Sequence, residues 1–337
     1  MKKTFKVLSI DGGGMKGLYS ATILHKVEQE LIRETGNQNA RIVDYFDLIC
    51  GTSTGGLIAL ALSLGISTKK ICEFYSVHGP KIFKKPIRPI GFLRQTLFFG
   101  KYSDKNLRGA LEGILGKNKI KDSRCLLCIP TYDFSHGTYE IFKYDHPEGN
   151  LNRDNELLMV DVALATSAAP TYFPIAEVAA HANRQYVDGG VWANNPSLIG
   201  YAEGIRHFAG GDKQYDDIEL LSISSLNIAS KQKPFSRRQR SFAGWRSKLF
   251  EMSMIAQSEF AHIFLESLKT ASQTPLRYLR ISSPSVQSVH VAHIDLDKAS
   301  KKSLTLMEQF GNDEYHKYKA QLKTFFEHKK TYQTKRR

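Results

Sequence analysis

DYFDLIC-GTSTG-GLIALALSL, residues 44–64, places a G-x-S-x-G pentapeptide between two apolar runs. The first run is typical of a buried strand, and the last run predicts a helix. Small residues on both sides of the serine permit a sharp turn that lifts its hydroxyl onto the helix N-terminus. We therefore predict a nucleophile at Ser53, with Gly51 and Gly55 as its supporting residues. Alone, the pattern is more often a turn and helix cap than a catalytic site.

A glycine-rich segment, DGGGMKG at residues 11–17, follows the strand-like run FKVLSI at residues 5–10. Consecutive glycines leave backbone N–H groups bare and free to adopt unusual dihedral angles. Such a loop can direct two N–H donors at the oxygen of a tetrahedral ester intermediate. We predict an oxyanion hole at Gly12, Gly13 and Gly14, supported by Asp11, Lys16 and Gly17.

A third motif, DGG at residues 188–190, closes the strand-like run RQYV at residues 184–187. Because glycines follow Asp188, a partner can approach its carboxylate closely, and we assign it as the general base with support from Gly189 and Gly190. An aspartate is a weak base, with an ordinary pKa near ~3.9, but desolvation beside Ser53 would raise its basicity. An alkoxide leaves with less acid assistance than an amine, so a Ser–Asp pair suits esters better than amides.

Taken in this order, DGGGMKG, GTSTG and DGG resemble the motifs of the patatin-like phospholipase family. The segments ATSAAPTYFP at 165–174 and VWANNP at 191–196 are also similar to patatin sequences, so that the resemblance covers roughly residues 5–225. It implies a lipid acyl hydrolase that uses a Ser–Asp dyad and needs no metal or other cofactor. Bacterial members of this length include antiviral effectors that a cyclic oligonucleotide switches on.

Two positions depart from the family pattern. Lys16 stands where arginine is commoner; it would either pin the oxyanion loop or attract a lipid phosphate, without the bidentate fork of arginine. LSISSL at residues 221–226 replaces a glycine-containing strand end that many relatives carry. The second departure concerns local loop geometry and leaves the predicted chemistry unchanged.

Three other hypotheses were considered. G-x-G-x-x-G at residues 12–17 fits a dinucleotide-binding fingerprint, but its expected acidic partner would fall at 28–34, inside a helix. A Ser-His-Asp triad is formally allowed, although none of the downstream histidines lies in a glycine-marked strand-end loop. Those histidines are His207, His262, His290 and His293. A non-catalytic protein that binds membrane or nucleic acid through basic surfaces is the alternative from another class.

Strand and helix signals alternate through the first 225 residues, which predicts a three-layer α/β/α fold with a mostly parallel central sheet. Strands are expected at 5–10, 44–50, 124–132, 138–144, 184–187 and 218–224. We assign residues 1–228 to a catalytic domain whose site lies at carboxyl ends of strands. Residues 229–337 form a basic, mostly helical extension packed on the core, with helices near 241–274 and 303–328 and a short strand near 277–281.

The charge and the apolar pattern of the 337-residue chain limit the kinds of partner that it is expected to bind. Its formal net charge is +14, and residues 229–250 carry seven basic side chains and no acid. The basic, aromatic-rich segment 79–101 is either a solvated cap or an interfacial lid against anionic lipid. We expect a phospholipid surface, a cyclic-nucleotide activator and a homo-oligomeric state, but no specific nucleic-acid binding, since no such module accompanies the charge.

Location is predicted from two absences. No apolar run reaches the ~18–20 residues of a membrane span, and the N-terminus runs directly into the first strand without a signal-peptide core. The expected location is the cytoplasm, with action at the inner face of the membrane. Cys125 and Cys128 have C-x-x-C spacing, but without a second pair we interpret them as buried strand residues.

Overall fold

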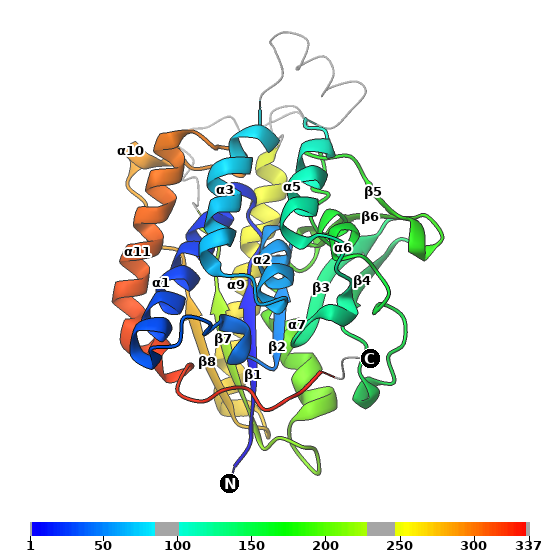
Figure 1. Cartoon of the computed structure of the whole chain (residues 1–337), viewed down its shortest axis with the longest axis vertical. Coiled ribbons are helices and arrows are strands. Elements are labelled where there is room, and N and C mark those ends of the chain that lie inside the picture. The colour runs from blue at the N-terminus through cyan, green and yellow to red at the C-terminus, as the bar shows by residue number, and fades with distance from the viewer. Residues whose placement is uncertain (1, 85–100, 228–246, 335–337) are drawn as a thin grey trace.

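A central eight-stranded sheet with helices on both faces organises the molecule in the computed structural model, which describes residues 2–84, 101–227 and 247–334 (Figure 1). The strand order is β5-β6-β3-β2-β1-β7-β8, with β4 paired to β3. The strands are β1 (Thr4–Ile10), β2 (Leu48–Gly51), β3 (Leu126–Asp133), β4 (Thr138–Lys143), β5 (Ala176–Val178), β6 (Arg184–Asp188), β7 (Asp217–Ile223) and β8 (Leu276–Ile281).

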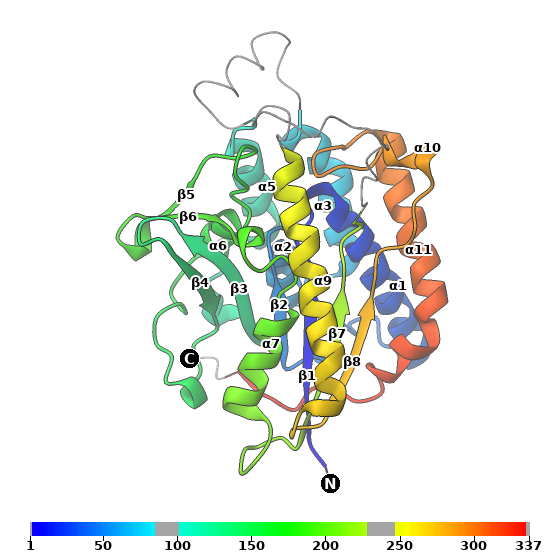
Figure 2. The same cartoon turned by 180° about the vertical axis from the view of Figure 1, so that it is seen from behind.

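Two helical layers cover the sheet. The helices are α1 (Gly17–Thr35), α2 (Thr54–Ser63), α3 (Thr68–Ile82), α5 (Lys105–Leu115), α6 (Met159–Thr166), α7 (Ser197–Glu203), α9 (Ser247–Ala271), α10 (Ser288–Val291) and α11 (Lys301–Thr324). Helices α1, α2, α3, α5 and α11 lie in front of the sheet in Figure 1, and α7 and α9 lie in front of it in Figure 2. The predicted three-layer α/β/α fold is confirmed.

The central strand β1 shows why the sheet needs two covering layers. Phe5, Val7, Leu8 and Ile10 are all fully buried, so both faces of this strand contact apolar helices. Parallel pairing with β2 and β7 places Ile10 level with Gly51 and with Ile223. The carboxyl ends of three strands therefore meet at one edge, where the loops that follow them can form a common site.

Strand β6 reaches this edge from the opposite direction. It pairs antiparallel with β3, with Asp188 level with Thr131, whereas β3 is parallel to β2. The residue that ends β6 is thus delivered toward the carboxyl end of β2. The sheet is mostly parallel, as predicted, and its antiparallel part is confined to β4, β5 and β6.

The predicted strand at 44–50 begins later, at Leu48, and the short strand β5 was missed. Residues Ile42–Asp44 form a 3-10 turn, and Asp47 uses its buried carboxylate as a backbone acceptor. Its Oδ2 accepts the N–H of Lys6 at 2.8 Å, and its Oδ1 accepts the N–H of Tyr332 at 2.7 Å. The local pattern does not show that Asp47 binds backbone groups from distant parts of the chain, and for this reason the strand was predicted to begin too early.

The C-terminal part of the chain contributes to the same sheet. β8 pairs in parallel with β7, and α11 packs along α1. The strand near 277–281 and the two long helices are confirmed, although the basic segment 228–246 lies outside the described residues. The division into two domains at residue 228 stays a prediction. Strand β8, which follows this boundary, is hydrogen-bonded to β7, which precedes it.

Most of the candidate lid, residues 85–100, also lies outside the described residues. Of the flanking positions, 79–82 belong to the end of α3, and Phe83 and Tyr102 make an edge-on ring contact with centroids 5.3 Å apart. Among the helices of the described ranges, none has both the length and the apolar character that a membrane span requires.

Candidate active site

Ser53 sits at the turn between β2 and α2 with φ 54° and ψ −125°, in a region that non-glycine residues rarely adopt. This strained conformation is the geometry of a nucleophile elbow. Two glycines make it sterically accessible. A Cβ on Gly51 would lie 2.1 Å from the carbonyl oxygen of Gly55, and a Cβ on Gly55 would lie 2.2 Å from that of Ile10. Gly51 and Gly55 would therefore support the elbow because only a residue without a Cβ lets the backbone approach this closely.

Substituting Gly51 by Ala is therefore expected to lower the free energy of unfolding by about 1–3 kcal/mol, since the added methyl group overpacks against backbone that cannot rotate away. The matched control is Gly113→Ala in α5, where nothing lies within 4 Å of the added atom. That control should raise stability by about 0.4–1 kcal/mol through the unfolded state. Urea unfolding followed by circular dichroism measures both, and equal effects would contradict the tight elbow.

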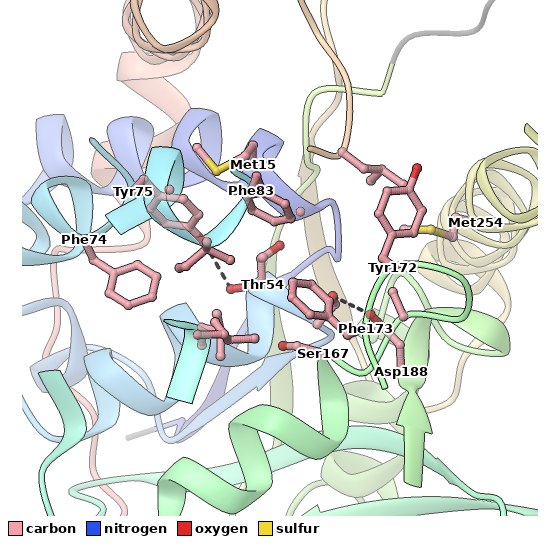
Figure 3. Close-up of a pocket in the computed structure, with 18 of the residues that line it drawn as sticks. Met15, Thr54, Phe74, Tyr75, Phe83, Ser167, Tyr172, Phe173, Asp188 and Met254 are labelled. Atoms are coloured by element: carbon pink, nitrogen blue, oxygen red, sulfur yellow. Dashed lines mark hydrogen bonds between the residues drawn. The ribbon is translucent and has the colours of Figure 1, made fainter. Parts of the chain in front are cut away.

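Ser53 and Asp188 are in direct contact (Figure 3). The Ser53 Oγ donates a hydrogen bond of 2.6 Å to Asp188 Oδ2, and the N–H of Gly190 donates one of 2.7 Å to Oδ1. Burial raises the pKa of Asp188 to about 7, against the lowering effect of these two hydrogen bonds. A carboxylate with this pKa is a better proton acceptor than an exposed aspartate and is still substantially ionised near neutrality.

The glycine-rich loop lies beside this pair. The N–H of Gly12 donates to the carbonyl of Asn194 at 3.0 Å, and the N–H of Met15 donates to that of Leu296 at 2.8 Å. Among the described residues, no acceptor takes the N–H of Gly13 or Gly14. Our prediction that Gly12 is a third oxyanion donor is therefore wrong, because its hydrogen is already engaged. Gly12 instead packs against the elbow, since a Cβ on it would lie 3.2 Å from that of Ser53.

An apolar cavity opens beside Ser53, Asp188 and Gly14 (Figure 3). The cavity volume is ≈ 50 Å³. Helices α2, α3, α5 and α9 supply its walls together with the glycine loop and the segments that carry Phe173 and Leu296. The apolar lining includes Met15, Leu57, Phe74, Ile82, Phe173 and Met254. The cavity places hydrocarbon-like surface next to a serine, a carboxylate and free N–H donors.

Sequence comparison agrees with the geometry. A family model described as patatin-like phospholipase matches residues 8–199. The chain belongs to the patatin-like phospholipase family. It is 31% identical to a cGAMP-activated phospholipase of Vibrio cholerae serotype O1, over 97% of this chain and 95% of that protein.

Two further relatives show how broad this family is. A cGAMP-activated phospholipase of Pseudomonas aeruginosa is 33% identical, over 79% of this chain and 76% of its own length. A probable inactive patatin of Solanum tuberosum is 32% identical, over 95% of this chain and 91% of its own length. Because proteins named as active and as inactive match comparably well, catalysis by this patatin-like chain has to be argued from its own site.

A buried ion pair holds the start of the patatin-like glycine loop. Arg280 of β8 donates to Asp11 through two nitrogens, at 2.6 Å and 3.2 Å, and both side chains are almost completely buried. Arg280 also donates to the Ser222 hydroxyl of β7 at 2.7 Å. Asp11 therefore lies next to the site as an anchor for the loop, and it does not face the cavity.

Lys16 is buried beneath the same loop. Burial lowers its pKa, and the nearby carboxylates of Glu251 and Asp295 partly oppose that effect. The interpretation of Lys16 as an attractor of lipid phosphate is therefore wrong, because the side chain is enclosed by the protein. Its position agrees with the other interpretation, in which this lysine pins the loop. The remaining supporting glycines, Gly17 and Gly189, each lie against the protein so closely that a Cβ would clash with Tyr75 or with Pro130.

Sequence reasoning missed the residues that fix this site from a distance. Arg280 and Leu296 come from the C-terminal part of the chain, and Asn194 and Thr166 from segments noted only for their family resemblance. Thr166 Oγ1 accepts the N–H of Ser53 at 3.0 Å and so holds the elbow. Arg280 had only a weak local signal, because β8 carries two arginines, Arg277 and Arg280, and the sequence does not show that only the second is buried.

The alternative sites find no support in the geometry. None of the four histidines considered for a triad lines the cavity, and His207 and His262 contact Glu148 and Tyr278 instead. A dinucleotide fingerprint would need an acidic residue at 28–34 to bind the ribose. Glu28, the first one there, instead accepts hydrogen bonds from Thr68. In the described ranges, no cluster of three His, Cys, Asp or Glu side chains has a metal-binding arrangement.

Proposed function

We propose that this chain hydrolyses fatty acyl esters of membrane phospholipids, with Ser53 as nucleophile and Asp188 as general base. The observation that carries the proposal is the 2.6 Å hydrogen bond from Ser53 Oγ to Asp188, at the mouth of an apolar cavity. The apolar lining suits the part of an acyl chain next to the ester, since it offers apolar contacts to a ligand that is itself mostly hydrocarbon. Membership of the patatin-like family supports the same class of substrate.

Acylation is the first half of the reaction. Ser53 Oγ attacks the ester carbonyl carbon while its proton passes to Asp188 Oδ2, along the hydrogen bond already present. The carbonyl oxygen becomes an oxyanion that accepts hydrogen bonds from the N–H groups of Gly13 and Gly14. When the tetrahedral intermediate collapses, its C–O bond to the alcohol breaks. Protonated Asp188 then gives its proton to the departing alkoxide, which leaves as a lysophospholipid.

Deacylation repeats these steps with water. Asp188 accepts a proton from a water molecule as the oxygen of that water attacks the acyl carbon of the Ser53 ester. The second tetrahedral intermediate collapses, Ser53 recovers the proton from Asp188, and the fatty acid is released. Each half-reaction thus uses the same carboxylate first as a base and then as an acid, and needs no histidine.

The raised pKa of Asp188 gives this mechanism a pH dependence. Only the ionised carboxylate accepts a proton, and the pKa is about 7, so kcat/KM should rise about tenfold per pH unit below 7 and level off above it. Initial rates on a neutral short-chain ester at low substrate concentration, between pH 5 and 9, measure the profile. A rate that is flat between pH 5 and 7, or that falls as the pH rises, would exclude Asp188 as the base.

We further propose that a cyclic dinucleotide switches the enzyme on at the inner face of the membrane. Relatives from Vibrio cholerae and Pseudomonas aeruginosa that are named as cGAMP-activated support this proposal, as the similarity to the first spans nearly the whole chain. Addition of cGAMP is expected to raise fatty-acid release from anionic liposomes at least tenfold. Linear dinucleotides serve as the control. Equal release with and without any cyclic dinucleotide would remove the switch and leave the hydrolase.

The same assay separates an enzyme from a binding protein on this fold. An enzyme releases fatty acid, whereas a non-catalytic membrane-binding protein floats with liposomes and releases none under any condition. Absence of release with every cyclic dinucleotide and lipid mixture tested, from protein that still floats, would favour the binding protein.

A further inference from the structure

Helix α9 presents an apolar surface to solvent along its outer side. Leu249, Met252, Phe260 and Ile263 are 51%, 53%, 64% and 63% exposed. The helix runs across the front of the molecule in Figure 2, and no other described element lies over it. Phe264, with its ring centroid 6.1 Å from that of Phe260, widens the surface at one end. We call this set, with the exposed Ala256, the outer stripe of α9.

The inner side of the same helix is already used by the fold. Met254, Ser258, Ala261 and Leu265 are buried and repeat with the spacing of one helix face. They lie about half a turn away from the outer stripe around the helix axis. A helix that packs on one face ordinarily carries polar residues on the other. Large apolar side chains gathered on the solvent side instead mark an interaction surface.

Apart from Phe264, the outer stripe is symmetric about its centre. Leu249, Met252, Phe260 and Ile263 lie at −7, −4, +4 and +7 from Ala256. Two copies of the helix that cross antiparallel at Ala256 would therefore place Met252 against Phe260 of the other copy, and Leu249 against Ile263. The smallest side chain falls at the crossing point, where helix axes approach most closely. A two-fold interface requires this self-complementarity.

The charges beside the stripe argue against a lipid surface as its partner. Glu259 and Glu266 are both exposed along one edge, and Lys269 is held 3.1 Å from Glu266, so the described side chains of this edge are net acidic. Interfacial helices that bind anionic membranes place lysine and arginine in these flanking positions. In the antiparallel pair, Glu259 falls opposite the exposed Ser253 of the other copy, so no like charges face each other there.

We propose that the outer stripe of α9 is a homodimer interface, formed by antiparallel packing against the same helix of a second copy. The opposite side of α9 contacts the candidate active site. Phe250 and Met254 line the cavity, and Gln257 donates to the carbonyl of Val191, three residues after Asp188, at 2.9 Å. Pairing of two copies would thus fix a helix that forms part of the wall beside the dyad.

The first test is the mass of the full-length protein in solution. Wild type is expected to form a dimer in sedimentation at micromolar concentration, and Phe260→Glu should raise the dimer dissociation constant at least about 30-fold, as for a central apolar contact. Val289→Glu, at a position 62% exposed in α10, is the matched control and should leave the dimer unchanged. Thermal unfolding of all three proteins checks that the variants fold.

Cross-linking tests the register. With a short bis-maleimide, Ala256→Cys should cross-link to itself, because the two-fold axis passes through this position. Ile263→Cys should cross-link to Leu249→Cys on another copy but not to itself, since the two 263 positions would lie about 21 Å apart. Wild type is the background, and its cysteines are buried or partly buried.

Three results would overturn the proposal. They are a monomer at all concentrations, with and without cyclic dinucleotide; a dimer that Phe260→Glu leaves intact; and cross-linking of Ile263→Cys to itself in place of Ala256→Cys. Loss of liposome flotation in Phe260→Glu without a change in mass would assign the stripe to lipid. Because none of these measurements depends on turnover, failure here is distinguishable from failure of the proposed hydrolase.

Discussion

Replacement of Ser53 by Ala is expected to lower fatty-acid release by at least about 10⁴-fold, because removal of a nucleophile from a cooperating catalytic unit eliminates covalent catalysis. The substitution removes one oxygen and its hydrogen bond to Asp188. The protein should still fold, since the N–H of Ser53 keeps its bond to Thr166. Release is measured from phospholipid vesicles with cyclic dinucleotide present, beside a thermal unfolding curve for each protein.

The matched control is Ser63→Ala at the far end of the same helix. The Ser63 hydroxyl is buried and donates to the carbonyl of Leu60 at 2.8 Å, so this variant also loses one buried hydroxyl hydrogen bond. It should keep activity within a few-fold of wild type. More than a tenth of wild-type release from folded Ser53→Ala would mean that another residue is the nucleophile.

Replacement of Arg280 by Met should cost about 3–5 kcal/mol in the free energy of unfolding, because it leaves the Asp11 carboxylate buried without its partner. The contribution of the pair itself is much smaller, since burial of two charges also costs desolvation energy. The double variant Asp11→Asn with Arg280→Met should therefore recover a large part of the loss. Urea unfolding of the single and double variants measures this difference.

An exposed ion pair provides the comparison. Lys269 and Glu266 are 3.1 Å apart at the surface of α9, and Lys269→Ala should cost less than about 1 kcal/mol. A similar small cost for Arg280→Met would contradict the buried anchor. The Arg280 variant should also lose activity beyond its loss of stability, because Asp11 begins the loop that carries Gly13 and Gly14.

The local part of the site could be predicted from the sequence because its geometry depends on neighbouring residues. Gly51 and Gly55 permit the elbow at Ser53, and the pentapeptide at residues 51–55 is enough to predict this backbone constraint. The glycine loop was recognised for the same reason. Which of its N–H groups remain free was not predictable, since Gly12 is engaged by Asn194, far away in the chain.

The tertiary part of the site had no comparable signal. Arg280 and Leu296 reach the glycine loop only because β8 adds to the edge of the sheet beside β7. Strand pairing between distant segments is decided by burial across the whole sheet, which a local pattern does not contain. Likewise, the sequence led us to expect Asp188 near Ser53. It did not predict that β6, the strand that brings Asp188 there, would run antiparallel to β3.

The central claim is that Ser53 is a nucleophile activated by Asp188. Covalent trapping of the serine tests this claim most directly. A long-chain alkyl fluorophosphonate is incubated with wild type, Ser53→Ala and Asp188→Asn, with cyclic dinucleotide present, and the adduct is located by peptide mass spectrometry. We expect one adduct in wild type, on the peptide that contains Ser53, none in Ser53→Ala, and labelling at least about 10³-fold slower in Asp188→Asn. An adduct on a different residue, or equal labelling rates in wild type and Asp188→Asn, would contradict the Ser–Asp dyad.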